Sequence, residues 1–266
     1  MKYRLLGLFP FVFALAFGAA ALALASSQGT VLTVETEAGK LIDFAGCLAA
    51  ALAFERGDYL RRAWLTYGSC SLLLLAKDAF GTGESPATGL LRGLLVVAAN
   101  VLLAYGAWML ARAWSVAGLE EDEPGTRRRR RTIFALFALL SLAITGLPLL
   151  HDVRSLLAGH FEALVSIASD FGDAIVLALV APVATTALAM RGGLLRWPWG
   201  FLTMAGVTWL AYDVSSGIVD AWHVGPGLAL VASEALRAVA NGFAFSAGMA
   251  QRFALAPDER LSIPPG

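Results

Sequence analysis

The stretch TWLAYDVSSGIVDAW, residues 208–222, has the character of a helix in the interior of a membrane, yet it carries Asp213 and Asp220. A carboxylate in the hydrocarbon layer is unfavourable, and it usually faces other protein groups or water. If this stretch crosses a membrane, the rest of the chain must supply partners for its acidic side chains. The predicted fold and the candidate site both follow from that requirement.

The composition of the chain is typical of a membrane protein. Of its 266 residues, 58% are hydrophobic and 15% are charged, and the mean hydropathy is +0.69. Soluble domains are about half apolar and about a quarter charged. The formal net charge is zero, which argues against a nucleic-acid partner. The two cysteines, Cys47 and Cys70, lie in apolar stretches and form neither a disulfide framework nor a CxxC metal motif.

Eight segments are apolar over most of the roughly 20 residues that a helix needs to cross a bilayer. They predict an all-α, polytopic membrane bundle. The second and third segments are short and depend on polar ends. The predicted spans are residues 5–26, 38–54, 63–80, 89–113, 132–150, 161–190, 198–219 and 226–250.

The basic residues predict the orientation of these spans. Cytoplasmic loops are rich in Lys and Arg, and with the N-terminus inside, 15 of the 20 basic residues fall on inner segments. This favours eight spans in the cell membrane with both termini in the cytoplasm. The alternative is a cleaved signal peptide, because residues 1–25 have a basic start, an apolar run and the A-x-A pattern Ala23–Ala25. Cleavage would leave seven spans.

Two segments of the chain resemble each other and predict an internal duplication. RGDYLRRAWLTYGSCSLLLLAKDAF, from Arg56, and RGGLLRWPWGFLTMAGVTWLAYDVS, from Arg191, share eight identities in 25 positions. Chance similarity between Leu- and Ala-rich helices is the alternative. The matches include rare residues, however: Trp64 aligns with Trp199, Asp78 with Asp213 and, after a six-residue slip, Asn100 with Asn241.

Because each repeat contains an even number of spans, the two halves would have the same orientation in the membrane, as parallel repeats do. We expect a first four-helix half at 1–116 and a second at 132–253. A cytoplasmic linker with an arginine run, 117–131, would join them, and a cytoplasmic tail, 254–266, would follow.

A polar cluster is expected between the sixth, seventh and eighth spans. Residues three or four apart share a helix face, and Arg237 is the only basic residue expected at this depth in the second half. Asp213 is predicted to lie within its reach. The surplus of acids would require water, protonation or a bound cation. The candidate ligand- or ion-binding residues are Asp170, Asp173, Asp213, Glu234, Arg237 and Asn241.

Other readings of the polar residues remain open. The cluster could be purely structural ion pairing, and Asp43, Lys77, Asp78 and Asp220 could simply reach the interface from helix ends. The histidines, which can ligate zinc when carboxylates lie nearby, follow no recognised metal motif and are better explained as solvated loop residues. These three are His151, His160 and His223.

No nucleophile elbow, Walker loop or dinucleotide-binding motif occurs in the sequence, which argues against an enzyme, and no cofactor is expected. The favoured function is an integral membrane binding or sensory module with a polar cavity in the outer leaflet for a small ligand or cation. A sensor would need a partner protein, for which the basic linker is a candidate surface. The alternatives are a proton- or cation-coupled transporter or channel and, more distantly, a membrane-embedded metal hydrolase.

Overall fold

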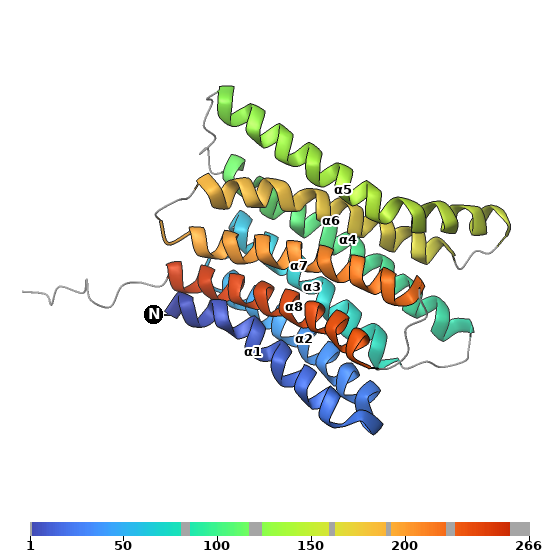
Figure 1. Cartoon of the computed structure of the whole chain (residues 1–266). Coiled ribbons are helices and arrows are strands. Elements are labelled where there is room, and N and C mark those ends of the chain that lie inside the picture. Colours follow the sequence, from blue (N-terminus) through green and yellow to red (C-terminus); the bar gives the residue numbers. More distant parts are fainter. Residues whose placement is uncertain are drawn as a thin grey trace, which may run out of the picture.

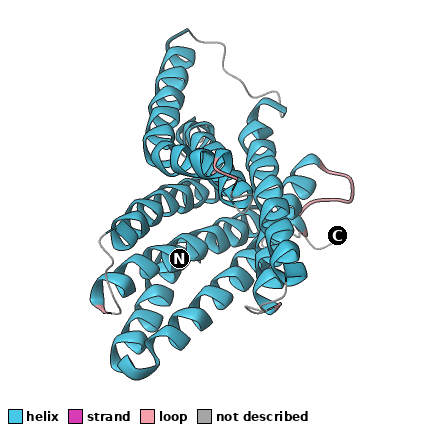
Figure 2. Ribbon diagram, turned by 90° about the vertical axis from the view of Figure 1, so that its right-hand side faces the viewer, coloured by secondary structure: helices cyan, strands magenta, loops and turns pink. Residues whose placement is uncertain are grey.

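The computed structural model describes residues 2–80, 86–116, 124–159, 163–189, 193–221 and 227–255, and all the regular elements within these ranges are helical (Figures 1 and 2). A short 3-10 turn, Ala25–Ser27, joins the first two helices. The long helices are α1 (Lys2–Ala23), α2 (Gln28–Ala51), α3 (Tyr59–Ala79), α4 (Pro86–Val116), α5 (Pro124–Leu157), α6 (Ala163–Ala189), α7 (Arg196–Ala221) and α8 (Leu228–Leu255).

Several of these helices are long and apolar enough to cross a membrane. In the described part of the chain, α1, α4, α6 and α8 meet this test by length and composition. A fifth candidate is α5, which bends by 45° between Gly146 and Leu149. Pro148 lies at this bend, and a proline removes a backbone N–H donor and commonly kinks a helix. The structure therefore supports a membrane protein with several spans.

The remaining helices, α2, α3 and α7, are also long. They contain 24, 21 and 26 residues, which at 1.5 Å per residue is about 36, 31 and 39 Å. Their charged side chains lower their hydropathy, and each of the three helices contributes charged side chains to the interior of the bundle, among them Asp43, Asp78 and Asp213. The largest departure from the predicted spans is in α2, which begins at Gln28, ten residues earlier than expected.

Six helices form a closed ring. Following the contacts, α2 packs on α3, α3 on α4, α4 on α6, α6 on α7, α7 on α8, and α8 again on α2. Two helices lie outside this ring: α1 packs mainly against α8, and α5 packs against α6. Figure 1 shows α1 at one side of the bundle and α5 at the other.

Small residues allow the helices of the ring to approach closely, as is common in membrane bundles. A Cβ added at Gly248 of α8 would overlap the backbone carbonyl of Gly46 in α2. Similarly, a Cβ at Gly106 of α4 would meet the backbone of Tyr67 in α3. On the outside of the ring, Gly242 of α8 lies directly on Pro10 of α1.

The chain starts and α8 ends at the same end of the bundle (Figure 1). Arginines gather at this end, near the starts of α3, α5 and α7 and near the ends of α4 and α8. We call it the basic end. Its described arginines include Arg61, Arg62, Arg112, Arg131, Arg196 and Arg252.

Candidate functional site

A cavity of about 590 Å³ lies within the ring of six helices. All six ring helices line it, whereas neither α1 nor α5 contributes a lining residue. This is within the usual size range of small-molecule sites, about 300–1,000 Å³. Eight of the lining side chains are formally charged, four basic and four acidic: Lys40, Lys77, Arg92, Arg237, Glu37, Asp43, Asp78 and Asp213.

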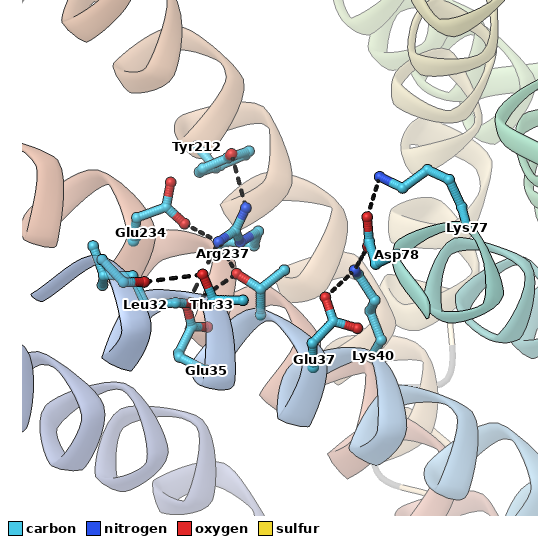
Figure 3. A network of polar contacts seen from close by, with 12 residues as sticks. Leu32, Thr33, Glu35, Glu37, Lys40, Lys77, Asp78, Tyr212, Glu234 and Arg237 are labelled. Carbon is cyan, nitrogen blue, oxygen red and sulfur yellow. Dashed lines mark hydrogen bonds and ion pairs between the residues drawn. The ribbon is translucent and has the colours of Figure 1, made fainter. Parts of the chain in front are cut away.

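Arg237 of α8 is the centre of one polar cluster in the cavity wall (Figure 3). Its guanidinium contacts the Glu234 carboxylate one turn earlier and lies 3.6 Å from the carboxylate of Glu35 in α2. It also donates hydrogen bonds to Thr36 of α2 and, at 3.3 Å, to the hydroxyl of Tyr212 in α7. One arginine therefore connects three helices and is shared by two acidic side chains.

A second cluster joins α2 to α3 (Figure 3). The Lys40 ammonium lies 2.7 Å from the Glu37 carboxylate and also contacts Asp78 of α3. Lys77 contacts the other oxygen of Asp78, at 2.8 Å. Two lysines and two carboxylates thus compensate each other.

Asp43 has a different environment from the other charged groups of the cavity. Asp43 is only 7% exposed. Its carboxylate accepts a 2.6 Å hydrogen bond from the Ser71 hydroxyl, and the Cys47 thiol lies 3.6 Å from its other oxygen. No lysine, arginine or histidine in the described ranges lies within ion-pair distance of it. It is therefore a buried carboxylate with neutral partners only.

The floor of the cavity is the layer of lining residues nearest the basic end. On each of the six helices, we assign to this layer the lining residue that is nearest the basic end. The layer then contains two aromatic rings, two leucines, one amide and a single charged group. Its members are Asp43, Tyr67, Leu103, Leu177, Trp209 and Asn241. The basic side chains of the wall lie further from the basic end along their helices.

Most of the candidate residues named from the sequence belong to this site. Asp213, Arg237 and Asn241 line the cavity, and the expected contact between Glu234 and Arg237 is present. Asp213 is half-buried and lines the same cavity as Arg237. Asn241 is buried and its side-chain amide lies against Gly39 of α2, where an added Cβ would force the amide to move.

The acidic residues of α6 differ from expectation. Asp170 is half-buried but is not among the lining residues, and its charged neighbour is Asp152 of α5. The side chain of Asp173 lies outside the described residues, as does that of Asp220 in α7. The sequence predicted that Asp170 belongs to the cluster around Arg237, but in the structure Asp170 lies near Asp152 of α5 instead.

Two features of the site differ from the sequence expectation. The partners of Arg237 do not come only from α6, α7 and α8, since α2 supplies Glu35 and Thr36. Asp43, Lys77 and Asp78, for which a position at the membrane interface was an alternative, all line the cavity, and the last two lie in the final turn of α3. The physical reason is the close packing of α2 against α8 and α3, through glycines that bring the polar face of α2 inside.

The α2 residues could have been found from their spacing. Thr33, Thr36, Lys40 and Asp43 recur every three or four positions, which is one face of a helix. This stripe was missed because residues 28–37 were predicted to be a loop. Ser71, which pairs with Asp43, gave no signal of its own in the sequence.

The structure describes only part of the histidine set that was considered for a metal. Among the described residues, no group of three or more His, Cys, Asp or Glu side chains could hold a metal ion. His151 is exposed on α5, and both His160 and His223 lie outside the described residues. The thiols of Cys47 and Cys70 are free and buried near Asp43 and Ser71.

The chain was also compared with models of protein families, with curated proteins and with solved structures. None of the three comparisons gives a match.

Proposed function

We propose that this protein is an integral membrane binding protein whose six-helix ring encloses a site for a small ligand or cation. The observation that carries the proposal is the cavity itself, which six helices line and to which they contribute eight formally charged groups. Charged residues within membrane helices are rare and usually mark a functional path or site. A merely structural set of ion pairs would not need an open volume of about 590 Å³ between them.

In this proposal, all eight helices cross the cell membrane, with the basic end in the cytoplasm. Charged side chains lower the hydropathy of α2, α3 and α7, but several of them, such as Lys40, Asp78 and Asp213, line the cavity. A helix that buries its polar face inside a bundle can cross a bilayer in spite of that face. The cavity would then lie towards the outer leaflet, and the linker 117–131 would be available to a cytoplasmic partner.

The proposed duplication is supported by the order of the ring. In the first half, α2 packs on α3 and α3 on α4; in the second half, α6 packs on α7 and α7 on α8 in the same order. The two contacts that join the halves, α4 with α6 and α8 with α2, also correspond to each other. One contact recurs in detail. Asn241 of α8 lies on Gly39 of α2, and Asn100 of α4 lies on Gly172 of α6. The aligned asparagines thus meet glycines in corresponding helices.

The proposal is tested by ligand binding to the purified protein in detergent. The probes are sodium chloride, potassium chloride, choline, 2-phenylethylammonium, glycine and glutamate, each at constant ionic strength. At least one should raise the thermal midpoint, because a ligand that binds only the folded state stabilises it.

A matched pair of variants on α4 makes this test specific to the cavity. Val96 lines the cavity, whereas Val101 is 61% exposed on the outer surface of the bundle. The shift should persist in Val101→Trp and disappear in Val96→Trp, whose indole would fill the site. No shift with any probe, or equal shifts in both variants, would contradict the proposal.

A transporter is the second candidate, and the repeated order of the ring favours it. Many transporters contain repeats and bind their substrate between them. In proteoliposomes, an imposed sodium or proton gradient would drive the uptake of a bound probe by a transporter, whereas a binding protein would show the thermal shift without flux.

A further inference from the structure

The starting observation is the position of Asp43 in the cavity. On α2 it is the lining residue nearest the basic end, and the three other lining acids lie further out or on other walls. Its oxygens have only hydroxyl and thiol partners, Ser71 and Cys47. A buried carboxylate with neutral partners is unfavourable unless a positive charge or a proton compensates it.

The nearby basic groups do not provide that charge. Lys40 is one turn from Asp43 on α2, but its ammonium contacts Glu37 and Asp78 instead. Arg237 is shared between Glu35 and Glu234. The wall clusters thus leave no cationic partner for Asp43 in the described part of the chain.

The surroundings of Asp43 indicate which cation fits. Metal cations such as Ca²⁺ and Mg²⁺ are held by about six or more oxygen atoms, but most of the floor is aromatic or aliphatic. Aromatic faces attract organic ammonium groups, and this attraction is stronger where water is excluded. Tyr67 and Trp209 provide such rings in the floor, and Leu103 and Leu177 complete it.

We propose that the floor of the cavity binds the ammonium group of a small organic amine, with the Asp43 carboxylate as its counter-ion. This inference rests on the proposed function and names its ligand class. The ammonium donates hydrogen bonds to Asp43, while the apolar body of the amine lies against the aromatic and aliphatic side chains. Ser71 and Cys47 fix the carboxylate from the other side.

The experiment compares matched probes by calorimetry on the purified full chain in detergent. The amine is 2-phenylethylammonium, its neutral analogue is 2-phenylethanol, and sodium chloride is the inorganic cation. The amine should bind at least about tenfold more tightly than the alcohol, the range expected for a charged hydrogen bond. Asp43→Asn should remove this preference and leave the weak affinity for the alcohol unchanged.

Two further variants make the result specific. Glu55→Gln removes an exposed carboxylate in the segment between α2 and α3 and should bind the amine like the parent. Leu103→Trp keeps Asp43 but fills part of the floor. It should lose 2-phenylethylammonium while keeping methylammonium, and it tests the site even if Asp43→Asn does not fold.

The inference is wrong if 2-phenylethanol binds as tightly as 2-phenylethylammonium, or if Asp43→Asn keeps the preference for the amine. It is also wrong if sodium binds at the site and displaces the amine. Failure of the two proposals can be told apart. If another probe binds in a way that Val96→Trp abolishes, the amine inference fails and the binding function stands. If no probe binds, both fail.

Discussion

Arg237 compensates the negative charge of two acidic side chains inside the bundle, Glu35 and Glu234. Its guanidinium contacts both Glu35 and Glu234, and Glu35, which is only 2% exposed, has no other basic partner among the ion pairs of the described residues. Removing the cation from a buried pair leaves a carboxylate without compensation, which is strongly destabilising. The stability of the α2–α7–α8 region should therefore respond to this one side chain.

We expect Arg237→Ala to lower the free energy of unfolding by about 3 kcal/mol, as for other broken buried pairs. Thermal unfolding in detergent measures the change. Adding Glu35→Gln should restore part of the stability, because it removes one of the stranded charges. Arg252→Ala is the control on the same helix: Arg252 is exposed in the last turn of α8, so the change should stay within about 0.5 kcal/mol. Strictly additive effects of Arg237→Ala and Glu35→Gln would show that the two residues are not coupled.

At the scale of the helices, the ring closes through the contact between α2 and α8. Gly46 and Gly248 lie face to face there, with a Gly248 Cβ position inside contact distance of the Gly46 carbonyl. Even a methyl group would separate the two backbones, and overpacking of this kind costs about 1–3 kcal/mol. The polar face of α2 would move with its helix.

Gly248→Ala should therefore lower the thermal midpoint and weaken binding of any cavity ligand. Gly200→Ala, in α7, is the matched control, since no atom lies within 4 Å of its added Cβ. That control should be neutral or stabilising by up to about 1 kcal/mol, because alanine favours the helix. If Gly248→Ala behaved like Gly200→Ala, the close approach of α2 and α8 would not limit stability.

The positions of the helices could be predicted from the sequence better than which helix packs against which. The apolar runs of α1, α4, α6 and α8 give clear spans, and the Glu234–Arg237 pair follows from helical spacing. The start of α2 was missed because Glu35 and Glu37 lower the hydropathy of a segment whose polar face is buried. The pairing of α2 with α8 joins residues about 200 positions apart, and their glycines carry no information about which helix they meet.

At the scale of the whole molecule, the arginines give the bundle its proposed direction. Most of the described arginines, among them Arg62, Arg131 and Arg196, lie at the end where α1 starts and α8 ends. Reporter fusions after Arg62, Arg131 and Arg196 should report the cytoplasm, and a fusion after Gly159, between α5 and α6, should report the outside. A cytoplasmic signal at Gly159 would be incompatible with eight spans in this orientation.

If the ring encloses a site that water and small molecules enter from the outer side of the membrane, as we propose, a thiol in the cavity should react with a reagent added outside the cell. Two leucines of α3 test it most directly: Leu74 lines the cavity, whereas Leu72 is 37% exposed on the surface of the bundle. Each is changed to cysteine in a Cys47→Ala, Cys70→Ala background and treated in intact cells with a membrane-impermeant methanethiosulfonate. Such reagents attack thiolates, which need water around them. We expect rapid modification of Leu74→Cys and little of Leu72→Cys, whose thiol would face lipid. An unmodified Leu74→Cys, or one modified only from the cytoplasmic side, would contradict it.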